Sequence, residues 1–526
     1  MLRSHLTVLE ASVARSPSAV AFKVPHAGSW RDITYAQFLD DVELIARHWS
    51  KTFQEAGIPE RSVVGLWIGG YRYSDILNIY GVSRAGYIPQ LFSLRLPSAD
   101  VILELLTKTG ARALVYEDLF ESALRTWPLP IYRAAEPDHV VGPSDLAMPP
   151  VFVGEKHETA FYFHTSGSTS GSPKLVPCSF GWLDMTVHKS SQICAPRSDR
   201  LDVAVWGGSM CHIFQNFMLI GYLQHNACTL QPVANPYTSE QLIEMIQDCH
   251  LNRLNIFASF LANHLRNSRQ ADSKLLKMLV NMDEIIYSGL ALPREEENYA
   301  YSQGIKLKSI FGSTEVGAML VSIGGCEPNA RFLRLTEGVA YKFVPIESAS
   351  SSAPHVSSAR LLELIILAES GDCPDQSLRH PDGDFHTGDL FQEVSPGCYM
   401  FEGRDDDWIK SEGGLRCNTK AIEDNARTMC GPLISECIAV GTGRPSVVLF
   451  VEPGLGTADD AKLKVEIIRK TRQFHTRRYL HERLASADSV VVVPRGSLPR
   501  TATKGNIRRK AVEEKYQVEI DRVFSR

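Results

Sequence analysis

Short apolar runs alternate with amphipathic segments along the first part of the chain. Residues 62–68 and 113–116 are apolar runs of strand length, whereas residues 36–54 and 73–85 repeat apolar side chains at helical spacing. Strands that alternate with helices form parallel sheets with crossover helices, so the pattern predicts an α/β fold. Residues 127–150 are Pro-rich and carry little pattern, and we expect a connector there.

The same alternation continues after a Gly/Ser-rich segment. Apolar runs predict strands at residues 201–206, 228–232, 254–257, 284–288 and 305–311. Amphipathic segments predict helices at residues 239–249, 260–268 and 273–282. Ser239 is a suitable N-cap for the first of these helices. Residues 344–356 are rich in serine, which favours a loose loop.

The pattern changes near residue 404. Beyond it, residues 437–440, 447–451 and 489–493 read as strands and residues 459–484 as a charged helix. A chain of 526 residues also exceeds what one hydrophobic core usually supports. We therefore expect a large N-terminal domain over residues 1–404, with parallel-rich sheets and crossover helices. A small mobile C-terminal α/β domain over residues 405–526 completes the expected organisation.

Composition narrows the functional class. The net charge is -5, which argues against nucleic acid as a partner. Eleven cysteines are scattered without a CxxC pair, so a structural zinc site is not expected and a reducing compartment is favoured. No apolar run has the length of a membrane span or of a signal-peptide core. We expect a cytoplasmic protein.

A Ser/Thr/Gly-rich loop between two short apolar runs is the first candidate for chemistry. Glycines allow close backbone approach, and successive N–H groups beside hydroxyls form an anion-binding concavity. The alternative is an ordinary flexible surface loop. The candidate loop is not a Walker A loop, because it lacks the Gly-Lys-Ser/Thr ending of that motif. The residues of the candidate phosphate cradle are Thr165, Ser166, Gly167, Ser168, Thr169, Gly171 and Lys174.

Two further motifs follow strand-like runs. Residues 310–315 (IFGSTE) combine an aromatic ring, hydroxyls and a carboxylate, which suit a base, a phosphate and a hard divalent cation. A strand-to-loop transition with a solvated glutamate is the plainer interpretation. Residues 386–389 (HTGD) again join a strand to a turn, where an aspartate more often bonds its own backbone.

Two more polar segments lie further along the chain. Residues 403–410 (GRDDDWIK) contain three adjacent acids, which could simply form a charged loop, and residues 498–506 (LPRTATKGN) form a polar loop. Together with the first loop, all five motifs resemble, in the same order, those of the adenylate-forming superfamily of acyl-CoA synthetases, luciferases and peptide-synthetase adenylation domains. This copy has an extra residue, Ser170, in the first loop, and Phe311 replaces the family's tyrosine.

The resemblance implies a role for each matching residue. Phe311, Gly312 and Ser313 would contact the nucleotide, Thr314 the α-phosphate, and Glu315 would ligate Mg²⁺. Asp389 would hold both ribose hydroxyls, and Arg404 would reach the ribose or a phosphate. Asp406 would be the hinge between the domains. Lys504, in a Lys-Gly order where the family has Gly-Lys, would lie against the substrate carboxylate and α-phosphate and neutralise developing charge.

The implied reaction has two steps. A carboxylate attacks the α-phosphorus of MgATP and releases pyrophosphate, and a thiol then displaces AMP from the acyl-adenylate. No side-chain nucleophile is required, so catalysis would consist of positioning and charge stabilisation. The small domain would turn to present Lys504 in the first step and residues 413–416 in the second. The expected partner is a small carboxylic acid.

Substrate choice is expected to lie in residues 206–217 and 287–291. His212 falls where acyl- and aryl-CoA ligases carry a gating histidine, although a buried core histidine is the plain alternative. No aspartate stands nearby to hold an α-ammonium, and a buried ammonium without a partner is costly. An aryl, fatty or keto acid is therefore favoured over an amino acid. The predicted pocket residues are Trp206, His212, Ile213, Tyr287, Gly289 and Leu290.

Two alternatives for the thiol acceptor remain open. The acceptor is CoA, or the phosphopantetheine of a carrier protein, because the C-terminal half is similar to fungal adenylation units of reductase-type, peptide-synthetase-like enzymes. The chain would then be a free-standing ligase or an adenylation unit serving a separate carrier. The same fold also supports oxygen-dependent luciferases and proteins that only bind a nucleotide.

Overall fold

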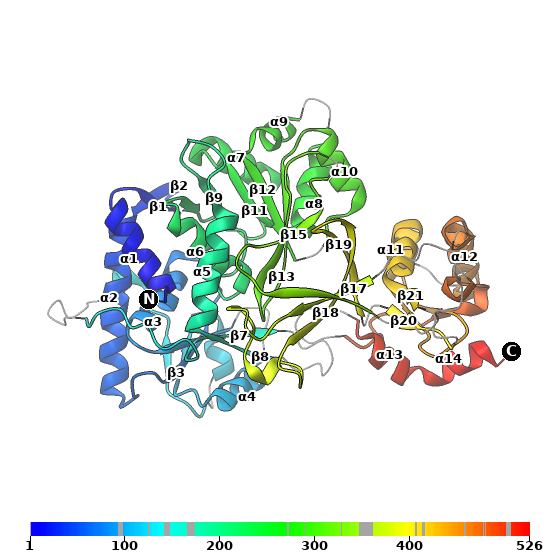
Figure 1. Ribbon diagram of the computed structural model, residues 1–526, viewed down its shortest axis with the longest axis horizontal. Coiled ribbons are helices and arrows are strands. Elements are labelled where there is room, and N and C mark those ends of the chain that lie inside the picture. The colour runs from blue at the N-terminus through cyan, green and yellow to red at the C-terminus, as the bar shows by residue number, and fades with distance from the viewer. Residues whose placement is uncertain are drawn as a thin grey trace.

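The protein has a large sheet-rich part, up to residue 405, and a smaller part from residue 408 onward (Figure 1). This organisation confirms the predicted α/β class. The computed structural model describes residues 2–92, 98–124, 127–140, 148–165, 174–270, 273–289, 291–327, 329–346, 361–405, 408–412, 416–456, 459–476, 478, 480–500 and 507–525.

The first sheet has six strands in the order β6-β5-β3-β4-β7-β8. β3 pairs in parallel with β4 and β5, and every residue of these three strands is buried, as in sheets covered on both faces. The strands are β3 (Val63–Trp67), β4 (Ile88–Phe92), β5 (Ala113–Tyr116), β6 (Ile131–Arg133), β7 (Thr159–Thr165) and β8 (Lys174–Ser179), and the crossover helices are α3 (Tyr73–Arg84) and α4 (Ala99–Thr109).

The second sheet has thirteen strands in the order β16-β17-β18-β19-β15-β14-β13-β12-β11-β9-β10-β1-β2. Its centre is parallel, and antiparallel strands extend both ends. The parallel strands are β1 (Val20–His26), β9 (Val203–Val205), β10 (Cys228–Leu230), β11 (Arg253–Phe257), β12 (Glu284–Ser288) and β13 (Leu307–Ser313). The antiparallel strands are β2 (Ser29–Thr34), β14 (Gly317–Ser322), β15 (Leu333–Leu335), β16 (Tyr341–Pro345), β17 (Leu361–Ile366), β18 (Phe385–Ser395) and β19 (Cys398–Arg404).

Helices pack on these two sheets because each presents an apolar stripe. In α2, for example, the buried side chains recur at helical spacing and the opposite face is polar. Besides the crossover helices α3 and α4, the α-helices of the large part are α1 (His5–Arg15), α2 (Tyr35–Glu55), α5 (Phe180–Cys194), α6 (Ile213–Gln224), α7 (Ser239–Cys249), α8 (Ala258–Asn267), α9 (Lys274–Asn281) and α10 (Arg294–Ser302).

The smaller part has its own core. A three-stranded sheet, β22-β23-β24, packs against helices, and a two-stranded ribbon, β20-β21, leads into it. Its elements are β20 (Trp408–Lys410), β21 (Arg416–Asn418), α11 (Thr419–Cys430), β22 (Ile434–Val440), β23 (Val448–Pro453), α12 (Asp460–Thr476), β24 (Val490–Val492), α13 (Arg509–Lys515) and α14 (Gln517–Phe524).

Four local predictions need correction or lie partly outside the described residues. Thr238, not Ser239, caps α7, because its side chain accepts a hydrogen bond from the Gln241 backbone N–H. The predicted helix 459–484 ends at Thr476, after which the chain folds back and buries Leu484 against the same core. The connector 127–150 contains β6, which pairs with β5. In the predicted loop 344–356, residues 344–345 belong to β16, and residues 347–356 lie outside the described residues.

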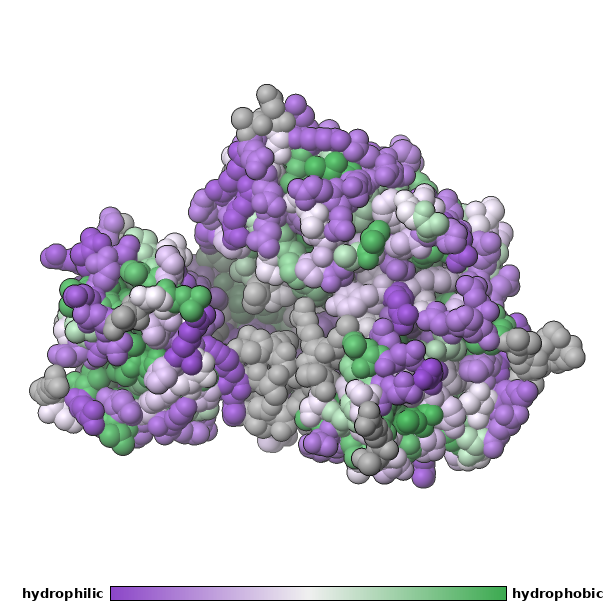
Figure 2. All heavy atoms as spheres, turned by 180° about the vertical axis from the view of Figure 1, so that it is seen from behind, coloured by the Kyte–Doolittle hydropathy of each residue, from purple (hydrophilic) through white to green (hydrophobic). Residues whose placement is uncertain are grey.

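Hydrophilic residues dominate the face shown in Figure 2, where apolar residues appear in small scattered patches. Among the residues that the structure describes, no helix is both long and apolar enough to cross a lipid bilayer.

Candidate active site

Three parallel strands end at one edge of the large sheet. Phe257, the last residue of β11, pairs with Ser288 at the end of β12, and Ser288 pairs with Ile310 of β13. Neighbouring strands lie about 4.8 Å apart, so Ser288 and Ile310 lie near Phe257, and β13 runs three residues further along the same edge to Ser313. Ligands of open α/β sheets bind at the carboxyl ends of the strands. This edge is therefore the candidate active site.

A tight turn joins β13 to β14 at this edge. A side chain at Gly312 would collide with the Gly317 backbone, so glycine lets the two strands approach closely. The Ser313 hydroxyl is buried and has no hydrogen-bond partner among the described residues, while Thr314 and Glu315 are partly exposed. Hydroxyl and carboxylate oxygens suit Mg²⁺, so the donor set of this turn fits a magnesium–phosphate group.

The hairpin that carries the predicted phosphate loop reaches the same turn. Trp182, just after β8, donates its indole N–H to the Glu315 carbonyl at 3.0 Å. Burial, reinforced by the nearby Glu315 carboxylate, raises the pKa of Cys178 in β8 well above its usual value. Thr165 and Lys174 pair directly across β7 and β8, so the two ends of the predicted loop are held together.

His164 lies next to that loop and stays neutral. It stacks on Phe92, with ring centroids 4.5 Å apart, and its Nδ1 lies 2.9 Å from the Leu91 carbonyl. Burial lowers the pKa of His164 to about 4. The imidazole therefore carries no charge near neutral pH, and Nδ1–H is the donor toward the carbonyl.

A buried ion pair fixes the backbone of the turn between β13 and β14. Lys189 of α5 donates from Nζ to the Asp372 carboxylate at 2.6 Å and to the carbonyls of Val316 and Ala318 at 2.8 and 2.7 Å. Both charged side chains are 0% exposed. Burial lowers the pKa of Lys189, and the Asp372 carboxylate opposes that effect. All three ammonium protons are thus used to fix the backbone around Gly317.

Aromatic rings show that the large sheet curls around this site. Phe311 of β13 contacts Phe391 of β18 and Phe401 of β19, with ring centroids 5.1 and 4.9 Å apart. β18 lies four strands from β13 in the sheet order, which would separate them by roughly 19 Å in a flat sheet. The curl therefore brings the motif on β13 close to the motifs on β18 and β19.

Asp389 and Arg404 are paired residues of β18 and β19. Their side chains lie 3.7 Å apart, with 9% of the Asp389 side chain and 46% of the Arg404 side chain exposed. The expected turn at residues 386–389 is wrong, because the segment lies within β18 and the irregularity is a bulge after Asp389. Gly388 adopts φ +68 there, a left-handed value that favours glycine.

Phe257 joins the two segments predicted to select the substrate. Its ring centroid lies 6.3 Å from that of His212 and 5.8 Å from that of Phe214. A Cβ placed on either Gly208 or Gly289 would come within 3.1 Å of the Phe257 ring. The absence of side chains at these two glycines therefore lets the backbone pack closely against the ring, and His212 and Gly289 both lie next to Phe257.

The other described residues of the predicted pocket are buried away from Phe257. Trp206 is 1% exposed and donates its indole N–H to the Gly208 carbonyl. Tyr287 is 3% exposed and directs its hydroxyl toward Glu297. Ile213 begins α6 and joins the core of the first sheet. These three side chains are therefore part of the protein interior.

Several predicted site residues lie outside the described residues. They belong to the phosphate loop, the second pocket segment, the hinge and the C-terminal lysine motif, and their assignments stay predictions. These residues are Ser166, Gly167, Ser168, Thr169, Gly171, Leu290, Asp406 and Lys504.

Four residues of the site were missed in the sequence. Phe257 is the last residue of a strand that the pattern predicts. Residues at the carboxyl ends of neighbouring parallel strands are candidates for a binding site, and this position could have indicated Phe257. Lys189 and Asp372 stand 183 positions apart, and no local pattern links them. Phe401 lies on a strand next to a predicted motif, so only the curl of the sheet gives it a role.

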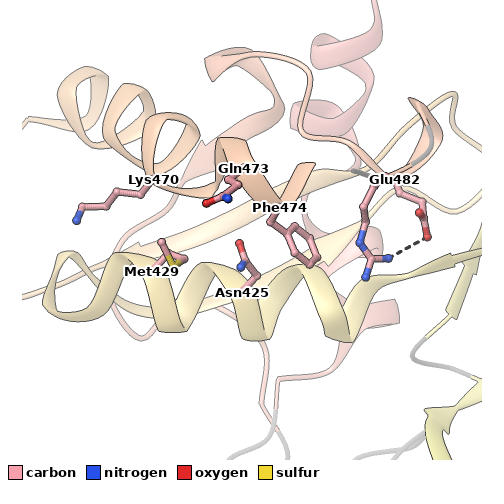
Figure 3. A pocket seen from close by; sticks show the side chains of 7 residues that line it. Asn425, Met429, Lys470, Gln473, Phe474 and Glu482 are labelled. Atoms are coloured by element: carbon pink, nitrogen blue, oxygen red, sulfur yellow. Dashed lines mark hydrogen bonds and ion pairs between the residues drawn. The ribbon is translucent and has the colours of Figure 1, made fainter. Parts of the chain in front are cut away.

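A surface groove of about 510 Å³ lies in the smaller part, away from this edge. Figure 3 shows it between α11 and α12, with Phe474 of α12 near Asn425 of α11, and with Met429 and Lys470 toward one end. Arg478 pairs with Glu482 at 3.2 Å and lies over the Phe474 ring. Thr314 and Glu315, the predicted catalytic residues that the structure describes, do not line this groove.

Solved structures with this fold include o-succinylbenzoate CoA synthetase (MenE) from Bacillus subtilis in complex with AMP. It has a TM-score of 0.75 and 14% identity, with 98% of each chain covered. The complex of the same enzyme with ATP and magnesium ion has a TM-score of 0.72 and 15% identity, covering 98% of this chain and 100% of that one. The fold is therefore that of adenylate-forming ligases.

Similarity in sequence identifies the protein family. Residues 9–339 match the AMP-binding enzyme family, and residues 406–526 match the AMP-binding enzyme C-terminal domain. The AMP-binding domain-containing enzyme iboA of Amanita muscaria is 34% identical over 517 residues, 95% of this chain and 98% of that protein. The chain belongs to the AMP-binding enzyme family, and it is an adenylate-forming enzyme.

A second relative is longer than this chain. The adenylate-forming reductase Nps10 of Heterobasidion annosum is 23% identical, and the match covers 94% of this chain but 47% of the reductase. The chain thus spans about half the length of that relative.

Proposed function

We propose that this enzyme activates an aryl, fatty or keto acid as an acyl-adenylate and transfers the acyl group to a thiol. The observation that carries the proposal is the register of β11, β12 and β13. It supports the proposal because Phe257 and the turn that holds Ser313 and Glu315 lie at the same edge of the sheet, and the acid would bind around Phe257. An acid in the pocket would then present its carboxylate to the α-phosphate of ATP, and such positioning supplies much of the catalysis in transfers of this kind.

The nucleotide would lie along the curled sheet. In this proposal, Phe311 packs against the adenine, Asp389 accepts hydrogen bonds from both ribose hydroxyls, and Arg404 contacts the ribose or a phosphate. Thr314 contacts the α-phosphate. The loop between Thr165 and Lys174 would surround the β- and γ-phosphates with backbone N–H groups. The pairing of the two loop ends and the buried support of the turn both favour this arrangement.

Glu315, with the Ser313 hydroxyl beside it, would hold Mg²⁺. Bound there, the cation would neutralise phosphate charge. The chain's own contribution is to hold these oxygens fixed, since the Glu315 carbonyl is bound by Trp182 and the next turn residues by Lys189.

The pocket chemistry favours an acid without an α-ammonium. Among the described residues, Gly208, His212, Phe214, Phe260 and Gly289 contact or approach Phe257, and none of these five carries a negative charge. An ammonium buried against them would lack a counter-ion, which is costly. The phenyl rings and the imidazole instead offer apolar and aromatic contact.

The smaller part would act as a mobile lid. We propose that the domain boundary lies at residues 404–405 and that Asp406 is the hinge. Lys504 would face the carboxylate and α-phosphate during adenylation, and residues 413–416 would line the thiol path afterwards. The acceptor would be CoA or the phosphopantetheine of a carrier protein. The similarity to a reductase about twice as long favours an adenylation unit that serves a separate carrier as the second possibility.

Exchange of pyrophosphate into ATP tests the adenylation step. The purified protein should catalyse exchange with at least one aryl, fatty or keto acid in a panel that also contains amino acids. Exchange with amino acids alone would contradict the proposed acid class, and a folded protein that exchanges with no acid would contradict adenylation. Thioester formation with CoA, compared with a phosphopantetheinylated carrier protein, identifies the acceptor.

Replacing Lys504 tests its assigned role. Lys504→Ala should lose most of the exchange rate but retain thioester formation from a preformed acyl-adenylate. Lys510→Ala is the matched control, because Lys510 is an exposed lysine of the same C-terminal region. Equal losses in the two half-reactions would contradict a role confined to adenylation.

A further inference from the structure

Two histidines and an aspartate converge just before and within the start of β18. The candidate ligand atoms of His380, Asp382 and His386 all lie within 4.8 Å of one another. Asp382 places one carboxylate oxygen 3.0 Å from His386 Nε2 and the other 3.5 Å from His380 Nδ1. The three side chains remain accessible, with 55%, 48% and 31% exposed in chain order.

A fourth residue orients one of these histidines from behind. His386 Nδ1 lies 3.6 Å from Glu363 Oε1, on the side of the ring opposite the cluster. Glu363 is itself fixed, because Oε1 accepts the Gly388 backbone N–H at 3.2 Å. A histidine that binds a metal commonly turns its other ring nitrogen to a carboxylate, which sets the tautomer and raises the basicity of the ligand. Glu363 is therefore placed to orient the His386 ring toward Asp382 and His380.

We propose that His380, Asp382 and His386 form a binding site for a divalent transition-metal ion, with Zn²⁺ as the best match. Zinc binds imidazole nitrogen and carboxylate oxygen at about 2.0–2.2 Å in tetrahedral geometry, which places ligand atoms roughly 3.4 Å apart. Asp382 Oδ2 lies 3.0 Å from His386 Nε2 and Asp382 Oδ1 lies 3.5 Å from His380 Nδ1, and both separations are close to that value. The fourth position would be open to water.

The ligand types separate this site from the Mg²⁺ proposed at Glu315. Magnesium prefers oxygen ligands in octahedral geometry and keeps several waters, whereas imidazole suits zinc, copper and nickel. Nearby positive charge is compensated, since Lys342 pairs with Asp384 at 2.7 Å.

The metal would hold a turn against a strand that carries a predicted nucleotide contact. The turn around Gly383 is closed by its backbone N–H to the His380 carbonyl, and Asp382 accepts the Asp384 N–H at 3.0 Å. Crosslinking His380 and Asp382 to His386 fixes this turn to β18 three residues before Asp389. A role in rigidifying that end of the strand follows, and it does not depend on the acid or thiol proposed above.

Titration of the metal alone tests the site. Tag-free, full-length protein, treated with a chelator and then dialysed, is titrated calorimetrically with zinc chloride in millimolar Mg²⁺. We expect one Zn²⁺ per chain. His380→Ala should weaken binding by more than about tenfold, and Glu363→Gln, which keeps an oxygen acceptor for Gly388, should weaken it roughly 10- to 100-fold. Visible absorption of the Co²⁺-loaded protein should show the strong bands of a low-coordinate site.

Two further variants guard against loss of fold and against non-specific binding. Asp382→Asn keeps an acceptor for the Asp384 N–H but loses charge, and it should also weaken zinc binding. His139→Ala removes an exposed histidine elsewhere and should leave the isotherm unchanged. Absence of a zinc isotherm in the native protein, or an unchanged affinity in His380→Ala, would overturn the proposed site.

Discussion

Replacing Lys189 with methionine should destabilise the large part of the protein severely. Lys189 and Asp372 are both 0% exposed, and their charged atoms lie 2.6 Å apart. Methionine fills a similar volume but leaves the Asp372 carboxylate buried without its cation. Breaking a buried pair by removing one partner costs about 3–5 kcal/mol.

The surroundings decide where in that range the loss falls. Asp372 keeps hydrogen bonds from the hydroxyls of Tyr341 and Ser370, which reduces the loss. The carbonyls of Val316 and Ala318 lose their donor, which adds to it, since an unsatisfied buried group costs about 1–3 kcal/mol. Because these effects oppose each other, we expect a loss of about 4 kcal/mol in the free energy of unfolding.

Thermal and denaturant unfolding of the full-length protein measure this loss. The unfolding entropy of roughly 400 residues converts 3–5 kcal/mol into a fall of about 4–6 °C in the Tm of the large part. Lys108→Met is the matched control, because Lys108 pairs with Glu104 at the surface, where such pairs contribute about 0–1 kcal/mol. Pyrophosphate exchange below the transition should also slow in Lys189→Met, since the turn with Glu315 loses its support.

A double-mutant cycle separates the ion pair from simple loss of packing. With Asp372→Asn added, no buried charge is left unpaired, so the double variant should be more stable than the sum of the two single losses predicts. The reasoning would be refuted by a loss below about 1 kcal/mol in Lys189→Met, or by strictly additive losses in the cycle.

Three other predictions concern the pocket, the nucleotide site and acid stability. Phe257→Ala should raise the KM for the acid and change the preferred acid, with the KM for ATP unchanged; a parallel change in both constants would contradict a pocket role. Asp389→Asn should raise the KM for ATP about tenfold or more, because a charge-assisted hydrogen bond contributes about 1.5–3 kcal/mol, while thermal stability should change little. His5 is buried, neither of its ring nitrogens has a hydrogen-bond partner among the described residues, and burial lowers its pKa from 6.5 to about 3. The folded state therefore excludes a proton that the unfolded state binds below pH 6.5, so His5→Phe should gain about 2 kcal/mol more stability near pH 5 than near pH 8. Unfolding curves at the two pH values measure this difference, and equal gains would contradict it.

The parallel strands and their crossover helices could be predicted because their signal is local. Residues 113–116 and 284–288 coincide with β5 and β12, since a buried parallel strand is a short apolar run in the sequence. The prediction of a helix up to residue 484 is wrong, because a charged segment with weak apolar periodicity does not indicate where the helix ends. β6 was missed since only its pairing with β5 distinguishes Ile131–Arg133 from a connector.

Residues of the site could be predicted from the sequence only where they belong to a recognisable local motif. The segments around Glu315 and Asp389 are recognisable from composition and order. The contacts that hold them are not local, because Lys189 meets Asp372 and Phe311 meets Phe391 through the curl of a thirteen-stranded sheet. Phe257 illustrates the same limit, since its role depends on the register between strands and not on its neighbours in sequence.

The register also bears on the proposal that one edge serves both the acid and the nucleotide. Phe257 at the end of β11 is two strands from Ile310 of β13, roughly 10 Å across the sheet, and β13 runs three residues further to Ser313 before the turn with Glu315. That offset is set by backbone hydrogen bonds and not by the side chains around Phe257. Under the proposed function, substitutions around Phe257 should change which acid is accepted while the turn keeps its geometry, because the turn is fixed independently by Lys189 and Trp182. Selectivity and nucleotide binding should accordingly be separable by mutation in this fold.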